Sequence, residues 1–131
     1  ETVVLDVPRP AAWTPAIKAL LADANIIYLL VQTSLPAAAG ALAVAAAVSE
    51  LSTRRRGPRC ELVVQGAKGS NTHKTEIAEL VGWPVAGFYR PERDLSTRIE
   101  VGAGPIGLSS GRYRRSKLAK VGLELAQRMA V

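Results

Sequence analysis

The stretch IIYLLV, residues 26–31, shows no alternation between polar and apolar side chains. Alternation would indicate a strand with one face in water, whereas an unbroken apolar run of this length is typical of a parallel strand with both faces buried. We therefore predict that residues 26–31 form a central strand of a parallel sheet.

Three shorter apolar runs predict further strands on either side of it, at residues 2–6, 61–65 and 85–89. Helical patterns lie between and after these runs, at residues 14–24, 36–53, 74–81, 93–101 and 115–130. Strands that alternate with longer helical segments are typical of βαβ units. The predicted fold is α/β: a three-layer, mostly parallel sheet with helices on both faces, in one domain over residues 1–131.

Two features of the composition limit the class of protein. The single cysteine, Cys60, begins an apolar run, which indicates an inert, half-buried thiol in a reducing compartment. The longest apolar stretch, residues 35–51, is mostly alanine and falls short of the ~20 strongly apolar residues that a membrane span needs. We expect a cytoplasmic chain without a transmembrane segment, associated with a membrane or cell pole only through partners.

The net charge of +6 is concentrated in the second part of the chain. Residues 54–131 hold fifteen basic and seven acidic side chains, whereas residues 1–53 hold two and four. This asymmetry suggests an anionic partner, with a solvated basic surface as the plainer explanation. The candidate anion-binding residues are Arg54, Arg55, Arg56, Arg59, Arg112, Arg114, Arg115 and Lys117.

No catalytic motif is complete. Residues 68–75, KGSNTHKT, resemble a phosphate-binding loop, but Lys68 and His73 stand where that loop needs glycine for backbone amides to approach a phosphate. Residues 102–107 spell G-x-G-x-x-G, yet they follow a predicted helix and contain Pro105, so a dinucleotide-binding turn is not expected. The chain has one histidine, which excludes a His-based metal cluster.

Asp6 is the first candidate for a cofactor contact. It would stand at the carboxyl end of the predicted strand at residues 2–6, where nucleotide-binding α/β folds place an acid beside a magnesium ion. The alternative is an aspartate that only caps the following loop.

The order of four segments, TVVLDVPRP, IIYLLVQTSLPAAAGA, ELVVQGA and IAELVGWPVAGFYRPERDLSTRIEVGAGP, resembles the C-terminal half of the MinD/ParA family of P-loop ATPases. The similarity is closest to actinobacterial septum-site-determining and CpaE/TadZ-like pilus-localisation proteins. It implies a P-loop NTPase-like domain whose phosphate loop would precede Glu1. It also implies that Asp6 supports magnesium indirectly, that Pro91 lies beside the adenine, and that Gln65 replaces an adenine-recognising asparagine.

The resemblance implies a positioning protein that acts in cell division or pilus assembly by nucleotide-dependent association. Its cofactors would be ATP and Mg in the full-length protein, and the 131-residue chain alone would be catalytically silent. We expect self-association, because one alanine-rich helix covers only one face of the strand at residues 26–31. Division or secretion/pilus proteins are further expected partners. The alternative hypothesis is a non-enzymatic module that binds nucleic acid or an acidic lipid surface.

Overall fold

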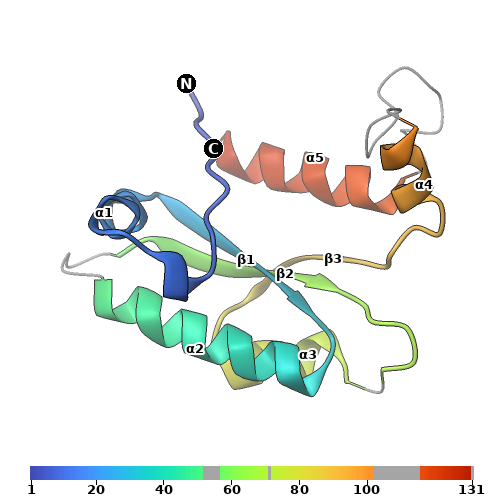
Figure 1. The fold of residues 1–131 in the computed structure, drawn as a ribbon, viewed down its shortest axis with the longest axis horizontal. Helices are drawn as coiled ribbons and strands as arrows, with labels where there is room; N and C mark the ends of the chain where they lie inside the picture. Colours follow the sequence, from blue (N-terminus) through green and yellow to red (C-terminus); the bar gives the residue numbers. More distant parts are fainter. Residues whose placement is uncertain (52–56, 71, 102–115, 131) are drawn as a thin grey trace.

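The computed structural model describes residues 1–51, 57–70, 72–101 and 116–130. Its centre is a parallel three-stranded sheet in the order β1-β2-β3 (Figure 1). The strands are β1 (Ile26–Gln32), β2 (Arg59–Gln65) and β3 (Val85–Tyr89). The helices are η1 (Pro10–Ala12), α1 (Pro15–Asp23), α2 (Leu35–Leu51), α3 (Lys74–Val81), α4 (Leu95–Glu100) and α5 (Lys117–Met129).

Two crossover helices lie on the same face of the sheet. α2 connects β1 to β2, α3 connects β2 to β3, and the two helices pack against each other. Strands that follow one another in the sheet, joined by crossovers of a single hand, must place their helices on one side. α5 lies on the opposite face, against β3 (Figure 1). The α/β class and the three layers are therefore as predicted.

Local sequence signals account for the helix boundaries. The Thr14 hydroxyl accepts a hydrogen bond from the Ile17 amide at 3.3 Å, and Pro15 occupies the first turn of α1, where no amide donor is needed. α3 ends at Gly82, whose φ of +77° is a left-handed conformation that glycine adopts without a steric cost. The predicted helix at residues 74–81 is confirmed at both ends.

The main core lies between the sheet and the α2–α3 layer. Leu62 and Val64 of β2 are fully buried there, together with Ala38 of α2 and Ile77 of α3. Alanine on the inner face of α2 lets the helix backbone approach the sheet closely. The alanine-rich pattern at residues 36–53 therefore serves close packing as well as helix propensity.

α5 covers the other face of the sheet at Gly87, a position of β3 that has no side chain. A Cβ atom placed on Gly87 of β3 would lie 2.7 Å from Cγ1 of Val121, a buried residue of α5. The helix therefore rests directly on the β3 backbone. The predicted helix at residues 115–130 is confirmed as α5, with ends at Lys117 and Met129.

Two strand predictions are wrong. Residues 2–6 form no strand: Val3 and Val4 are 73% and 75% exposed, and no backbone hydrogen bond joins the described residues 1–9 to the sheet. β propensity reflects packing on neighbouring strands, so an apolar segment without a neighbour stays irregular. β1 is an edge strand instead of a central one, since the fully buried strand in the middle is β2.

Candidate functional site

The carboxyl ends of the parallel strands form one edge of the sheet, which is where open α/β sheets bind their ligands. β1 ends at Gln32, β2 at Gln65 and β3 at Tyr89. The strand register places Gln32 beside Gln65 and Gln65 beside Tyr89. We call these three residues the carboxyl-edge row. This edge lies at the right of Figure 1.

The two glutamines of the carboxyl-edge row are paired through their side chains. Nε2 of Gln32 donates a hydrogen bond to Oε1 of Gln65 at 3.2 Å. A primary amide has two donor hydrogens and an oxygen with two lone pairs, so both side chains keep donor and acceptor capacity after this bond. Gln32 is exposed and Gln65 is half-buried, so a ligand can reach them.

Backbone and hydroxyl contacts hold the loops around this row. The Thr33 amide donates to the Gln65 carbonyl at 3.0 Å, and the Thr33 hydroxyl accepts from the Ala67 amide at 2.7 Å. The Gly66 amide donates to the Tyr89 carbonyl at 2.9 Å. Thr33 is 4% exposed, so these bonds are shielded from water. The loop that follows β2 is thereby fixed to both neighbouring strands.

Cationic and aromatic groups flank the row. The ammonium of Lys74 lies 5.3 Å from the centre of the Phe88 ring, within the range of a cation–π contact. A Cβ atom on Gly66 would lie 3.5 Å from Cγ of Arg90, so the Arg90 side chain passes over this glycine. Burial raises the pKa of the Tyr89 hydroxyl, which therefore stays a neutral phenol at physiological pH. The edge combines neutral amides with two cations.

The structure brings Gln65 and Pro91 to the same edge and leaves Asp6 elsewhere. Pro91 is exposed and follows Tyr89, the register partner of Gln65, by two residues. Asp6 belongs to the irregular segment at residues 1–9, which lies at the left of Figure 1, away from the carboxyl ends of the strands. The strand end on which its magnesium role depended is not formed. Nowhere in the described part of the chain do three or more His, Cys, Asp or Glu side chains gather around a point that could hold a metal ion.

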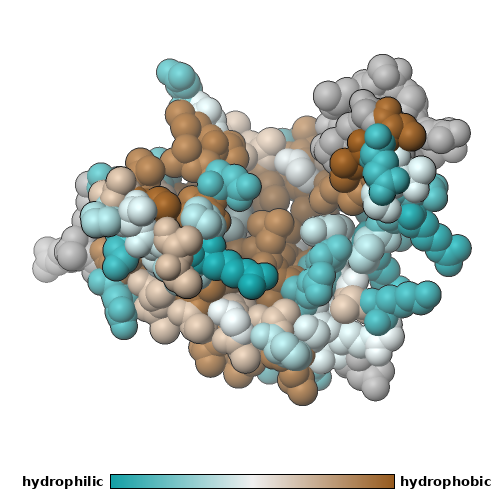
Figure 2. Space-filling model, in the orientation of Figure 1, coloured by the Kyte–Doolittle hydropathy of each residue, from teal (hydrophilic) through white to brown (hydrophobic). Residues whose placement is uncertain are grey.

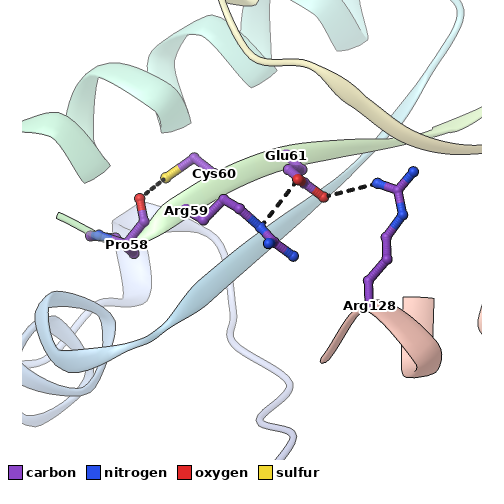
Figure 3. A network of polar contacts seen from close by, with 5 residues as sticks. All are labelled: Pro58, Arg59, Cys60, Glu61 and Arg128. Atoms are coloured by element: carbon purple, nitrogen blue, oxygen red, sulfur yellow. Dashed lines mark hydrogen bonds and ion pairs between the residues drawn. The ribbon is translucent and has the colours of Figure 1, made fainter. Parts of the chain in front are cut away.

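A polar network at the opposite end of β2 uses one of the predicted anion-binding residues. Arg59 and Arg128 both contact the Glu61 carboxylate, through Nε at 3.2 Å and a guanidinium NH at 3.4 Å (Figure 3). The Glu61 side chain is 11% exposed and ties α5 to the sheet. Arg59 is therefore already paired. Lys117 is exposed at the start of α5. The other predicted anion-binding residues, Arg54, Arg55, Arg56, Arg112, Arg114 and Arg115, lie outside the described residues.

Cys60, which precedes Glu61, is a half-buried free thiol. Its thiol donates to the Pro58 carbonyl, with Sγ 3.4 Å from the oxygen (Figure 3). Burial raises the pKa of the Cys60 thiol, which disfavours the reactive thiolate. The expectation of an inert, half-buried thiol agrees with this environment.

Sequence analysis did not identify Glu92 as a structural residue. Its carboxylate accepts hydrogen bonds from the Ser116 hydroxyl and from the Leu118 amide, the latter at 3.3 Å. Ser116 in turn caps α5 by accepting from the Ala119 amide at 3.1 Å. A carboxylate at a helix N-terminus also interacts favourably with the helix dipole. The segment after β3 therefore anchors the start of α5. The sequence indicates Ser116 as a helix cap, because it stands just before a helical pattern. The sequence does not indicate its partner Glu92, which is 24 residues away.

No helix among the described residues is long and apolar enough to cross a membrane. Comparison with protein-family models, with curated proteins and with solved structures found no match for this chain.

Proposed function

We propose that this chain supplies the base-recognition edge of a nucleotide-binding α/β domain of the MinD/ParA kind, which acts in septum placement or pilus localisation by nucleotide-dependent association. The observation that carries the proposal is the position of Gln65. Gln65 ends the central strand, and its side-chain amide is bonded to Gln32. Its register partner on β3 is Tyr89, two residues before Pro91. The resemblance of the segment order to that family supplies the rest of the proposal.

An adenine base fits the chemistry of this edge. A glutamine amide can donate to and accept from the edge of adenine at the same time, because its two groups match the ring nitrogen and the exocyclic amine. The amide of Gln65 keeps both capacities while bound to Gln32. Lys74 and Arg90 would favour the negatively charged remainder of a nucleotide.

The described residues offer no comparable site for a magnesium ion. Asp6 lies on an irregular, exposed segment away from the carboxyl-edge row, and no other acidic residue was predicted for the metal. We therefore assign no residue of this structure to magnesium. The proposal is limited to recognition of the base.

Titration with nucleosides, followed by 1H–15N NMR, tests the proposal. Adenosine should shift the amide signals of Gln65, Gly66 and Arg90, and inosine, which replaces the exocyclic amine by a carbonyl, should shift them less. Gln65→Leu should weaken adenosine binding by up to about tenfold, the loss expected for one uncharged hydrogen bond.

Gln127→Leu is the matched control, because Gln127 is exposed on α5 and its replacement should leave adenosine binding unchanged. Shifts that are absent, or that are spread over the surface with equal size for both nucleosides, would contradict base recognition. Equal affinity of Gln65→Leu and Gln127→Leu would remove Gln65 from the site.

A further inference from the structure

β1 presents a free edge to the solvent. The Arg59 amide donates to the Asn25 carbonyl, and the Thr33 amide donates to the Gln65 carbonyl. In β1, the N–H and C=O groups of the odd-numbered residues therefore point toward β2. In a parallel ladder the alternate residues point their N–H and C=O groups the other way. Within the described residues, the Gln32 carbonyl accepts a hydrogen bond from the Ser34 amide at 2.9 Å, and no other outward group of β1 bonds to another backbone group.

The edge lacks the features that usually prevent strands from pairing. β1 reads IIYLLVQ, with no proline and no charge. Natural edge strands are commonly protected by lysine, proline or a bulge. Leu30 is 67% exposed on the α5 side of the sheet, whereas its register partner Val63 on β2 is 4% exposed. On this side α5 packs mainly on β3, at the other edge of the sheet. Figure 2 shows hydrophobic surface in the middle of this view, between the N-terminal segment and α4.

We propose that two copies of this chain associate through antiparallel pairing of β1 with β1, so that two three-stranded sheets become one continuous sheet. A second copy is the occupant for an electrostatic reason. The chain carries a net charge of +6, so most of its surface repels another copy, whereas two uncharged strands meet without like-charge contact.

The register of this pairing follows from which groups point outward. A two-fold axis at Leu29 places Tyr28 opposite Leu30 of the partner subunit and Ile26 opposite Gln32 of the partner subunit. All of these residues have outward N–H and C=O groups, so they form hydrogen-bonded antiparallel pairs. Each of the two Tyr28–Leu30 pairs gives two interchain hydrogen bonds, and each of the two Ile26–Gln32 pairs gives one, because the Gln32 carbonyl already accepts from Ser34. This register therefore gives about six interchain hydrogen bonds, and no other symmetric register of the strand gives more. It also covers Leu30 with an aromatic side chain.

Sedimentation velocity over a concentration series tests the proposal. The wild-type chain should move from monomer to dimer as its concentration rises. Leu30→Lys and Leu30→Glu should each remain monomeric at concentrations where the wild type is dimeric, with unchanged circular dichroism. Leu80→Lys is the control, because Leu80 is 49% exposed on α3, away from β1, and its replacement should preserve the dimer.

A mixture of the two Leu30 variants tests the geometry. In the proposed register the two residues at position 30 are diagonal neighbours, so a lysine on one copy and a glutamate on the other should restore the dimer. A monomeric wild type at every concentration would overturn the proposal. So would a dimer that survives Leu30→Lys, or one that Leu80→Lys removes equally. None of these results depends on nucleotide binding.

Discussion

Replacement of Gly87 by alanine tests how α5 is attached to the sheet. The new Cβ would lie 2.7 Å from Cγ1 of Val121, about 0.8 Å inside the closest favourable carbon–carbon separation. Overpacking of this kind costs about 1–3 kcal/mol. The lower chain entropy of alanine offsets about 0.5–1 kcal/mol of that cost.

The expected net effect is a loss of about 1–2 kcal/mol in the free energy of unfolding, measured by urea titration, and a fall in Tm of about 3–7 °C. Val121→Ala removes the obstructing methyl groups, so Gly87→Ala should be neutral or stabilising in that background. The two substitutions should therefore be coupled by about 1 kcal/mol or more.

Gly40→Ala is the matched control. Gly40 lies within α2, and among the described residues a Cβ atom there would meet nothing within 4 Å outside the helix's own backbone. Alanine should therefore stabilise the chain by about 0.5–1 kcal/mol through helix propensity. The packing argument would be refuted if Gly87→Ala were as stable as the wild type. It would equally be refuted if its cost were the same with and without Val121.

Two further predictions concern charge. Burial raises the pKa of the Cys60 thiol above its ordinary value of 9.0, so folding favours the protonated thiol. The contribution of this group to the free energy of unfolding is complete below the unfolded-state pKa and is lost as the pH rises through the folded-state pKa. The free energy of unfolding should therefore fall above about pH 9 by more in the wild type than in Cys60→Ser, and parallel pH curves for the two chains would exclude this effect. If the basic second part of the chain binds DNA, reversal of charge at Arg112, Arg114 and Arg115 should abolish gel retardation and flatten its salt dependence, whereas Lys18→Glu on α1 should not. If the wild-type chain caused no gel retardation of DNA at low salt, the nucleic-acid hypothesis would be contradicted.

Local patterns were sufficient to predict most of the fold. Thr14 with Pro15, the alanine-rich run of α2 and the stop at Gly82 each act within a few residues, so the sequence shows them directly. The strands β2 and β3 were predicted for the same reason. The position of a strand within the sheet is a long-range property, and an apolar run such as residues 26–31 does not distinguish an edge strand from a central one.

The candidate site was only partly predictable. Gln65 was selected through a family resemblance, and its placement on the same sheet edge as Pro91 follows from parallel topology. The partner amide of Gln32 could not be inferred, because the pairing depends on a register between residues 33 positions apart. Asp6 was misplaced because an apolar run followed by an acid predicts a strand end only if a neighbouring strand exists to pair with it.

The bond between Arg128 and Glu61 spans 67 positions of the chain, whereas each strand pairs with the next one along the sequence. Contacts that close short loops form early, and those that close long loops form late. During synthesis, the layer of β1, α2, β2, α3 and β3 can therefore assemble before α5 has left the ribosome. Until that helix arrives, the β3 backbone at Gly87 lacks the cover of Val121, and a chaperone or a neighbouring chain can reach it.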